Sequence, residues 1–201
     1  PNEPTIIMAT QDGYIKRMNP GVYRVQKRGG KGVIGATTKE EDRIAKVLSI
    51  TTHDNLMFFT DTGKVFQTKA YEIPELLRTA KGQAIVNFLQ LSSNEKITAL
   101  ITLNKDDAYK YLFMATRDGV VKKVAIEEFI NIRRSGLIAI KLYEGDSLNW
   151  VRLTSGSDDI LLVTSDGGSI RFKEKDVRGM GRNAAGVTGI RLSKDDYIVG
   201  M

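Results

Sequence analysis

A unit of about fifty residues occurs four times in this chain, and this repetition restricts the possible folds more than any other feature of the sequence. Each copy has a run of apolar residues, a polar turn that contains glycine, and a second run that carries Lys or Arg. That order is typical of a β-hairpin. The turns are centred on Gly13, Gly63, Gly119 and Gly167. Their spacings of 50, 56 and 48 residues are close to the period of propeller blades.

Two further landmarks follow each hairpin in the same order. A second glycine, 17–19 residues past the turn, opens a short apolar strand; these glycines are Gly32, Gly82, Gly136 and Gly186. An acidic residue then opens a third apolar run; these acids are Asp42, Glu95, Asp146 and Asp196. We expect an all-β, propeller-like fold with four blades and about four strands per blade. The patterns "YEIPELLRTA" and "IEEFINIRR" are expected to be helical turns in connecting loops.

The chain is expected to form a single domain over residues 1–201, or a fragment of one. Its fourth repeat stops at Met201, just as its third strand begins, whereas the earlier copies run on into the next hairpin. The array is therefore expected to continue beyond the last residue.

The composition excludes several classes of protein. Of the 201 residues 41% are hydrophobic, which is enough for a substantial core. The absence of cysteine excludes disulfide scaffolds and cysteine-ligated metal sites. No apolar run approaches the roughly 18–20 residues of a membrane span, and the first residues lack the pattern of a signal peptide. We expect a cytoplasmic protein that does not contact a membrane.

Positive charge gathers near the N-terminus. Residues 1–31 hold six Lys or Arg against two Asp or Glu, which accounts for +4 of the net charge of +6. The stretch "VQKRGGKGVIG", Val25 to Gly35, contains three cations, four glycines and no acid. Glycine permits positive φ and leaves backbone N–H groups accessible, so this stretch predicts a loop that binds an anion.

Other interpretations of this stretch fit its context less well. Gly30, Gly32 and Gly35 match the dinucleotide fingerprint G-x-G-x-x-G, but no alternation of strands and helices follows, as a doubly wound sheet would require. A P-loop needs Ser or Thr after its lysine, whereas Lys31 precedes glycine. The simplest alternative is an exposed turn with basic residues and no ligand.

Every repeat carries basic residues at two equivalent places. Those after the hairpin turns are Lys16, Arg17, Lys64, Lys69, Lys122, Lys123, Arg171 and Lys173. Those before the second glycines are Arg78, Lys81, Arg133, Arg134, Arg178 and Arg182. Lysine on an edge strand can serve to prevent aggregation, but four copies in a curved array would form a basic rim suited to a continuous polyanion. Duplex DNA is favoured over single-stranded nucleic acid because the aromatic residues form no interleaved stacking platform.

The segment "QKRGGKG" resembles the Q-R-R-G-G-K-G box in the C-terminal domain of the DNA gyrase A subunit, with Lys27 in place of an arginine. The similarity extends over essentially the whole chain, through "GYIKR", "YEIPE", "RTAKGQAIVNFL", "RRSGLIAIKLYEGD" and "IRFKEKDVRGMGRNAAGVTGIRL". An intact box favours gyrase over the alternative, a topoisomerase IV-type C-terminal domain, whose box is usually degenerate or absent. Lysine at position 27 keeps the charge of arginine and loses its bidentate geometry.

The resemblance implies a β-pinwheel, a propeller-like disc of usually six blades that exchange strands with their neighbours. It implies that duplex DNA binds to the rim and to the box and is wrapped in a positive superhelical sense, in support of ATP-dependent negative supercoiling. The implied box residues are Gln26, Lys27, Arg28, Gly29, Gly30, Lys31 and Gly32.

The resemblance also implies partners and a division of labour. The partners would be the remainder of the gyrase A subunit, together with the gyrase B subunit, in an A2B2 holoenzyme on the bacterial or organellar nucleoid. Strand cleavage, ATP and Mg²⁺ would belong to other parts of that type II topoisomerase. The chain itself is therefore expected to hold no catalytic residue, cofactor or metal.

The remaining residues that could carry chemistry are expected to be structural. The seven tyrosines have no acidic cluster nearby that could hold Mg²⁺, His53 lies in a polar turn, and Trp150 lies in a strand of the core. A competing interpretation is a propeller-type scaffold whose basic rim binds an acidic protein. The salt dependence of binding would separate the two, because it is steep for duplex DNA.

Overall fold

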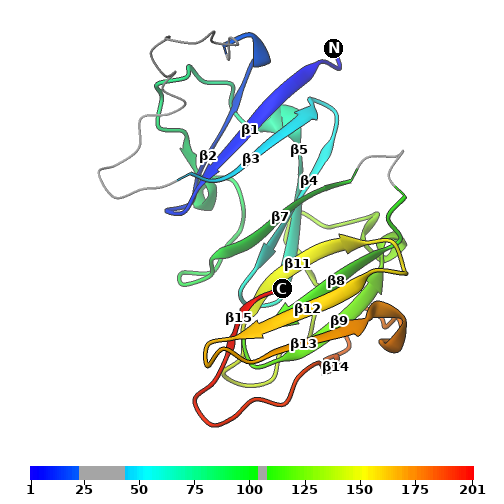
Figure 1. Ribbon diagram of the computed structural model, residues 1–201. Coiled ribbons are helices and arrows are strands. Elements are labelled where there is room, and N and C mark those ends of the chain that lie inside the picture. The colour runs from blue at the N-terminus through cyan, green and yellow to red at the C-terminus, as the bar shows by residue number, and fades with distance from the viewer. Residues whose placement is uncertain (23–43, 104–107) are drawn as a thin grey trace, which may run out of the picture. The chain divides into compact units, whose positions relative to one another are not determined.

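The computed structural model describes residues 1–22, 44–103 and 108–201, and the strands among them form four sheets, one for each repeat (Figure 1). We call each sheet a blade and number it by its repeat. The predicted all-β fold with four blades is confirmed.

The two central strands of each blade are the predicted hairpin. The pairs are β1 (Pro4–Thr10) with β2 (Tyr14–Met18), β4 (Asn55–Thr60) with β5 (Lys64–Lys69), β8 (Tyr111–Thr116) with β9 (Val120–Ala125), and β12 (Asp159–Thr164) with β13 (Ser169–Lys173).

The same four-residue turn closes every hairpin. Its glycine has φ between 83° and 88° in all four copies, a backbone region that other residues rarely adopt. The threonine three residues earlier is buried, and its Oγ1 accepts a hydrogen bond of 3.1–3.3 Å from the N–H four residues further along. These threonines are Thr10, Thr60, Thr116 and Thr164. The four sequence repeats therefore share the same glycine conformation and the same threonine hydrogen bond at the hairpin turn.

A third strand flanks the first strand of each hairpin. These strands are β3 (Ile44–Thr51), β7 (Ile97–Leu103), β11 (Leu148–Thr154) and β15 (Ile198–Gly200). In blades 1, 3 and 4 the register shifts beside the turn threonine, which indicates a β-bulge at the same place in each.

The fourth strand of a blade comes from the next repeat. The short strands β6 (Gln83–Ala84), β10 (Leu137–Ile138) and β14 (Val187–Thr188) pair with β2, β5 and β9, respectively. The blade orders are β3-β1-β2-β6, β10-β5-β4-β7, β11-β8-β9-β14 and β13-β12-β15. The expected exchange of strands between blades is confirmed. Among the described residues, blade 4 holds three strands, and β13 lies at its edge.

The second glycine of repeats 2, 3 and 4 permits this exchange. Gly82, Gly136 and Gly186 have φ of 99°, 84° and 94°. A Cβ on them would lie 2.9 Å from the Ile15 carbonyl oxygen, 2.8 Å from the Phe66 ring and 2.5 Å from the Val121 carbonyl oxygen, respectively. The exchanged strand therefore approaches the hairpin too closely for any side chain at this position.

The chain divides into two compact units. One contains residues 1–56 and 68–90, and the other contains residues 57–67 and 91–201. The expectation of a single domain over the whole chain stays a prediction.

Each unit has its own apolar core. In the first unit Ile7, Ile15 and Met18 are fully buried. In the second, Phe59 and Phe129 meet edge to face at 6.1 Å within one cluster, and Phe113 and Leu162 lie in another. Full burial of each such side chain stabilises the fold by about 1.5–3 kcal/mol.

The connections contain single 3₁₀ turns. They are η1 (Pro20–Val22), η2 (Ala70–Glu72), η3 (Ile85–Asn87), η4 (Ile126–Phe129) and η5 (Glu174–Asp176). The turns η2 and η4 lie at the start of the two patterns for which the sequence predicts helical turns, and the rest of each pattern is a loop. None of the helices in the described part of the chain is long and apolar enough to cross a membrane.

Candidate nucleic-acid interface

The predicted box lies outside the described residues. All of its members, Gln26, Lys27, Arg28, Gly29, Gly30, Lys31 and Gly32, fall between residues 23 and 43. The fourteen basic residues predicted for the rim are all described, and their environments divide them into three groups.

Three of the fourteen, Lys16, Lys122 and Lys123, are buried, with exposed fractions of 2%, 0% and 6%. The half-buried members are Arg17, Lys64, Lys69, Arg78 and Arg182. The exposed members are Lys81, Arg133, Arg134, Arg171, Lys173 and Arg178.

Lys16 binds backbone carbonyl groups of the following repeat. Its Nζ donates hydrogen bonds to the carbonyl oxygens of Leu77 at 3.4 Å, Arg78 at 2.6 Å and Ala80 at 2.8 Å. These three residues lie in the loop before Gly82. Burial lowers the pKa of the Lys16 amine from its usual value.

Lys122 makes similar contacts in blade 3, two of them with the loop before Gly186. Its Nζ donates to the carbonyl oxygens of Ala139 at 2.9 Å, Arg182 at 2.5 Å and Ala184 at 2.9 Å. Burial and the positive charge of Arg182 lower the pKa of the Lys122 amine to about 8, against the opposing effect of Glu128. Its neighbour Lys123 donates to the Glu174 carbonyl oxygen at 3.1 Å.

The structure therefore corrects the predicted rim at these three positions. The amines of Lys16, Lys122 and Lys123 are enclosed and bonded to carbonyl oxygens, so a phosphate outside the protein cannot reach them. The alternation of strand side chains was the signal that could have identified two of them. Lys16 shares a strand face with buried Met18, and Lys122 shares one with buried Val124.

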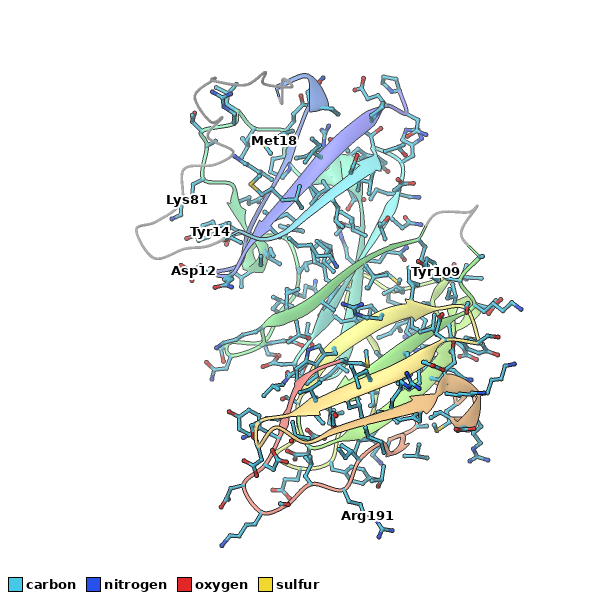
Figure 2. All side chains as sticks on the ribbon, in the orientation of Figure 1. Asp12, Tyr14, Met18, Lys81, Tyr109 and Arg191 are labelled. Carbon is cyan, nitrogen blue, oxygen red and sulfur yellow. The ribbon has the colours of Figure 1, made fainter. Side chains whose placement is uncertain are left out.

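The exposed cations that remain are concentrated in the loops before the second glycines. Each loop contains a tight turn, closed by a backbone hydrogen bond from Ala80 to Leu77 at 3.0 Å, from Gly136 to Arg133 at 2.9 Å, or from Ala184 to Gly181 at 3.1 Å. In the first of these loops the Lys81 ammonium lies 4.1 Å from the centre of the Tyr14 ring, and Figure 2 shows the two side chains together. By position in the repeat, these loops correspond to the segment that contains the box.

Ion pairs reduce the free charge of some other members. Arg17 pairs with Glu75 at 2.9 Å, Arg182 lies 3.9 Å from Glu128, and Arg171 lies 4.0 Å from Asp159. Within the described part of the chain, no carboxylate lies within 4 Å of five exposed cations. They are Lys81, Lys173, Arg133, Arg134 and Arg178.

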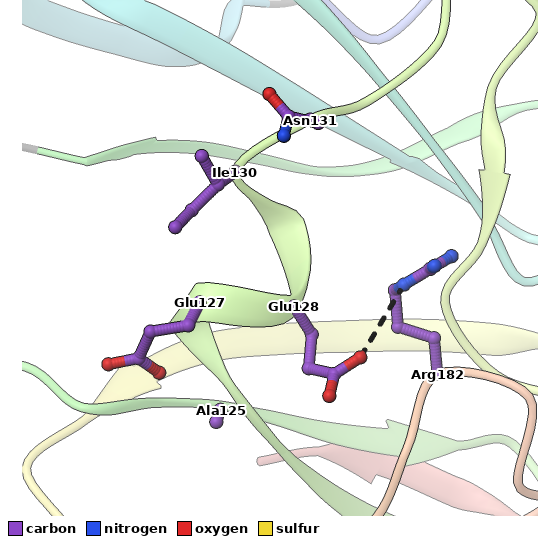
Figure 3. Close-up of a pocket in the computed structure, with 6 residues that line it drawn as sticks. All are labelled: Ala125, Glu127, Glu128, Ile130, Asn131 and Arg182. Carbon is purple, nitrogen blue, oxygen red and sulfur yellow. Dashed lines mark ion pairs between the residues drawn. The ribbon is translucent and has the colours of Figure 1, made fainter.

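A hollow beside η4 has the wrong charge for a phosphate. Figure 3 shows its lining, in which Glu127 and Glu128 contribute two carboxylates and Arg182 one guanidinium, along with Ala125, Ile130 and Asn131. In residues 1–22, 44–103 and 108–201 no three His, Cys, Asp or Glu side chains cluster as a metal site would require. His53 is exposed and meets Tyr71 edge to face, while Trp150 is partly buried against the core of the second unit.

The segments of this chain that match a known family correspond to its four repeats. The family model described as "DNA gyrase C-terminal domain, beta-propeller" matches residues 4–51, 54–104, 110–155 and 158–201. The DNA gyrase A protein of Clostridium acetobutylicum is 50% identical over 187 residues, which are 93% of this chain and 22% of that protein. The DNA gyrase A protein of Staphylococcus aureus is 44% identical over 202 residues, 100% of this chain and 23% of that protein. The chain thus spans less than a quarter of the length of these relatives.

Two solved structures are similar to the described fold. The C-terminal domain of a DNA topoisomerase IV has a TM-score of 0.86 at 33% identity, over 100% of this chain and 61% of that chain. A DNA gyrase A C-terminal domain has a TM-score of 0.72 at 27% identity, over 98% of this chain and 64% of that chain.

Proposed function

The chain belongs to the DNA gyrase C-terminal domain family, and from this premise we propose that it binds duplex DNA through exposed basic loops and wraps it. The wrapped segment supports ATP-dependent negative supercoiling by the holoenzyme. The chain contributes DNA contacts, while strand cleavage, ATP and Mg²⁺ belong to the gyrase B subunit, or to the remainder of the gyrase A subunit, in an A2B2 assembly in the cytoplasm.

One observation carries this proposal most directly. Loops at equivalent places in successive repeats present cations that no carboxylate in the described residues neutralises, Lys81, Arg133, Arg134 and Arg178 among them. Contacts of Lys and Arg with phosphates need no base code, so they suit wrapping, which depends on the DNA backbone.

The energetics require many such contacts. Bending 20–30 base pairs through 40–90° costs on the order of 1–6 kcal/mol. Each phosphate that the protein neutralises adds a term of about −0.9 to the log–log slope of affinity against salt. A series of weak contacts can offset the bending cost. The box residues, above all Lys27, Arg28 and Lys31, would fasten one end of the wrap.

A topoisomerase IV-type function is the second candidate, because the topoisomerase IV domain has a TM-score of 0.86 with this chain. A domain of that type would also bind duplex DNA. The near-complete box and the identity of 44–50% with gyrase A proteins favour the gyrase function.

The test uses three variants that each remove three positive charges. They are Lys27, Arg28 and Lys31 to alanine; Arg133, Arg134 and Arg178 to alanine; and, as a control, the exposed residues Lys141, Arg152 and Lys194 to alanine. The full chain is incubated with nicked circular DNA, the DNA is ligated, and the sign of the linking-number change is measured together with affinity over a range of salt concentrations.

We expect positive linking-number shifts from the wild-type chain and from the control. The loop variant should lose up to about 2.7 units of salt slope, at 0.9 per phosphate, and the box variant should lose the shift and retain much of its affinity. Binding without any shift would mean that the chain is an electrostatic platform that does not wrap DNA by itself. Equal losses of salt slope and of linking-number shift in all three variants would mean that binding depends only on net charge, which would contradict the proposed loops and box. A wild-type affinity that does not depend on salt would contradict DNA binding.

A further inference from the structure

Two buried lysines tie the loops that carry the exposed cations to the preceding blade. Lys16 of β2 binds the loop that contains Arg78 and Lys81, across 61–64 residues of sequence. Lys122 of β9 binds the loop that contains Arg182, across 60 and 62 residues. Both lysines stand three residues after a turn glycine, so the contact recurs at the same register of the repeat.

A lysine ammonium bound to carbonyl oxygens can hold the backbone of the loop in place. A lysine ammonium has three donors and no acceptor, and each of these two amines has three carbonyl oxygens within 3.4 Å. Burial of a charge is unfavourable unless such partners surround it. In the first loop the backbone hydrogen bond from Ala80 to Leu77 closes the turn, and the Lys16 ammonium binds the carbonyl oxygens of Leu77, Arg78 and Ala80 from inside the blade.

Blade 2 uses an apolar contact in place of the amine. Phe66 stands at the equivalent position, is 1% exposed, and packs its ring where a Cβ of Gly136 would lie, 2.8 Å away. In blade 4 the equivalent residue is Ile170, which is 37% exposed. The register position thus contacts the loop of the following repeat in blades 1, 2 and 3, with an ammonium in two of them.

We propose that Lys16 and Lys122 are positioning residues for DNA binding, each fixing the basic loop of the following repeat in the geometry in which its cations meet phosphates. This inference rests on the proposed function. A loop already ordered before DNA arrives loses less conformational entropy on binding. The two lysines would therefore raise affinity and the number of phosphates contacted without touching DNA.

The experiment is a double-mutant cycle in the full chain. One arm is Lys16→Met, which keeps an unbranched side chain one atom shorter and removes its charge, and the other is the pair Arg78→Ala and Lys81→Ala. Lys175→Met, at an exposed position in η5, is the matched control for the loss of one charge. Duplex affinity is measured over a range of salt concentrations, and the melting temperature of each variant is measured in parallel.

A positioning role predicts a salt slope that falls by more than one lysine can explain. Lys16→Met should lose up to about 1.8 units of slope, the value for two phosphates at 0.9 each, and should have no further effect when Arg78 and Lys81 are already alanine. Non-additivity of this kind is the signature of residues that act through one another. Lys122→Met should act in the same way on Arg178, the exposed cation of the segment before Gly186.

Other outcomes would overturn the inference. If Lys16→Met lowers only the melting temperature and leaves the salt slope unchanged, the lysine is structural and does not position the DNA contacts. The same holds if its effect adds fully to that of the loop pair.

If the proposed function is wrong, the wild-type chain itself will show no salt-dependent binding of duplex DNA, which distinguishes that result from failure of this inference. If Lys16→Met does not fold, amide hydrogen exchange of the loop in wild-type protein with and without a short duplex replaces it. A loop between residues 77 and 82 already protected before DNA is added supports the inference, and one that gains protection only with DNA overturns it.

Discussion

Acidic side chains at the start of the third strands hold the hairpin turns of their own blades. Glu95 accepts hydrogen bonds from the hydroxyl groups of Thr60, at 2.7 Å, and Thr62, and from the Ser92 N–H at 3.0 Å. Asp146 accepts the Asp118 N–H at 3.0 Å, and Asp196 accepts the Asp166 N–H at 3.1 Å. Each acid therefore links two points that lie about thirty residues apart in the sequence, at 35, 28 and 30 residues.

The Glu95 contacts predict a loss of stability in acid. Burial raises the pKa of Glu95, but the hydrogen bonds from Thr60, Thr62 and Ser92 and the charge of Lys64 outweigh it, so the pKa is lowered overall. The unfolded chain then binds the proton more readily, and the contribution of Glu95 is present above the ordinary glutamate pKa and is lost as pH falls toward the lower folded value.

Glu95→Gln should thus reduce the free energy of unfolding by about 1–3 kcal/mol at pH 7, with the difference from wild type shrinking toward pH 3. Urea unfolding between pH 3 and 7 measures it, with the exposed Glu144→Gln as the control. A difference that does not change with pH would contradict the ionised role of Glu95.

At the scale of the elements, the exchanged strands contain two residues each and depend on glycine. The strand β14 pairs Val187 with Val121 and Thr188 with Val120. Gly186 immediately precedes it with φ of 94°, and a Cβ on this glycine would meet the Val121 carbonyl oxygen. So short a strand has few hydrogen bonds, and its approach to β9 is set by the absence of a side chain at this position.

Gly186→Ala should therefore destabilise the fold by about 2 kcal/mol or more, because the new Cβ would lie 2.5 Å from the Val121 oxygen in a strained backbone conformation. Gly181→Ala is the control, since no atom lies within 4 Å of its new Cβ and its φ is not positive. The control should change stability by about 0.5 kcal/mol or less. Thermal unfolding compares the two variants. Similar melting temperatures would show that stability does not depend on the close approach of Gly186 to Val121.

The elements with local signals could be predicted from the sequence. Turn glycines with flanking apolar runs predict the hairpins, and the acidic residues predict where the third strands begin. The exchange of strands followed from the family resemblance, because a two-residue strand has no periodicity of its own. The burial of Lys16 and Lys122 was missed, because lysine is ordinarily solvent-exposed and the carbonyl partners of these two lie some sixty residues away. The proposed contacts of the box stay a prediction.

At the scale of the whole molecule, exchange makes blades 1, 2 and 3 depend on the repeat that follows each of them. Blades 1, 2 and 3 each receive a strand from the next repeat, while β13 in blade 4 pairs only with β12 among the described strands. Alternate N–H groups of a strand point to opposite sides within the sheet, so about half of those on β13 face away from β12. Ile170 and its neighbours on β13 are exposed accordingly.

Amide hydrogen exchange should separate β13 from β9, its counterpart in blade 3. We expect the alternate amides of β9 that face β14 to be protected, and the corresponding amides of β13 to exchange at rates close to those of an open chain, because protection follows hydrogen bonding and burial. Mass spectrometry or NMR on the full chain gives the rates. Equal protection of the two strands would show that another segment covers the β13 edge in solution.

The exchanged strands also have a consequence for biosynthesis. A nascent blade 1 lacks its fourth strand until β6 leaves the ribosome, and blades 2 and 3 wait in the same way for β10 and β14. With 63–69 residues between the end of a hairpin and the end of the short strand that pairs with it, and translation at about 5–20 residues per second, each of these edges stays open for about 3–14 s. Slow codons between a hairpin and the next short strand would prolong the time in which the newest edge can pair with a neighbouring nascent chain.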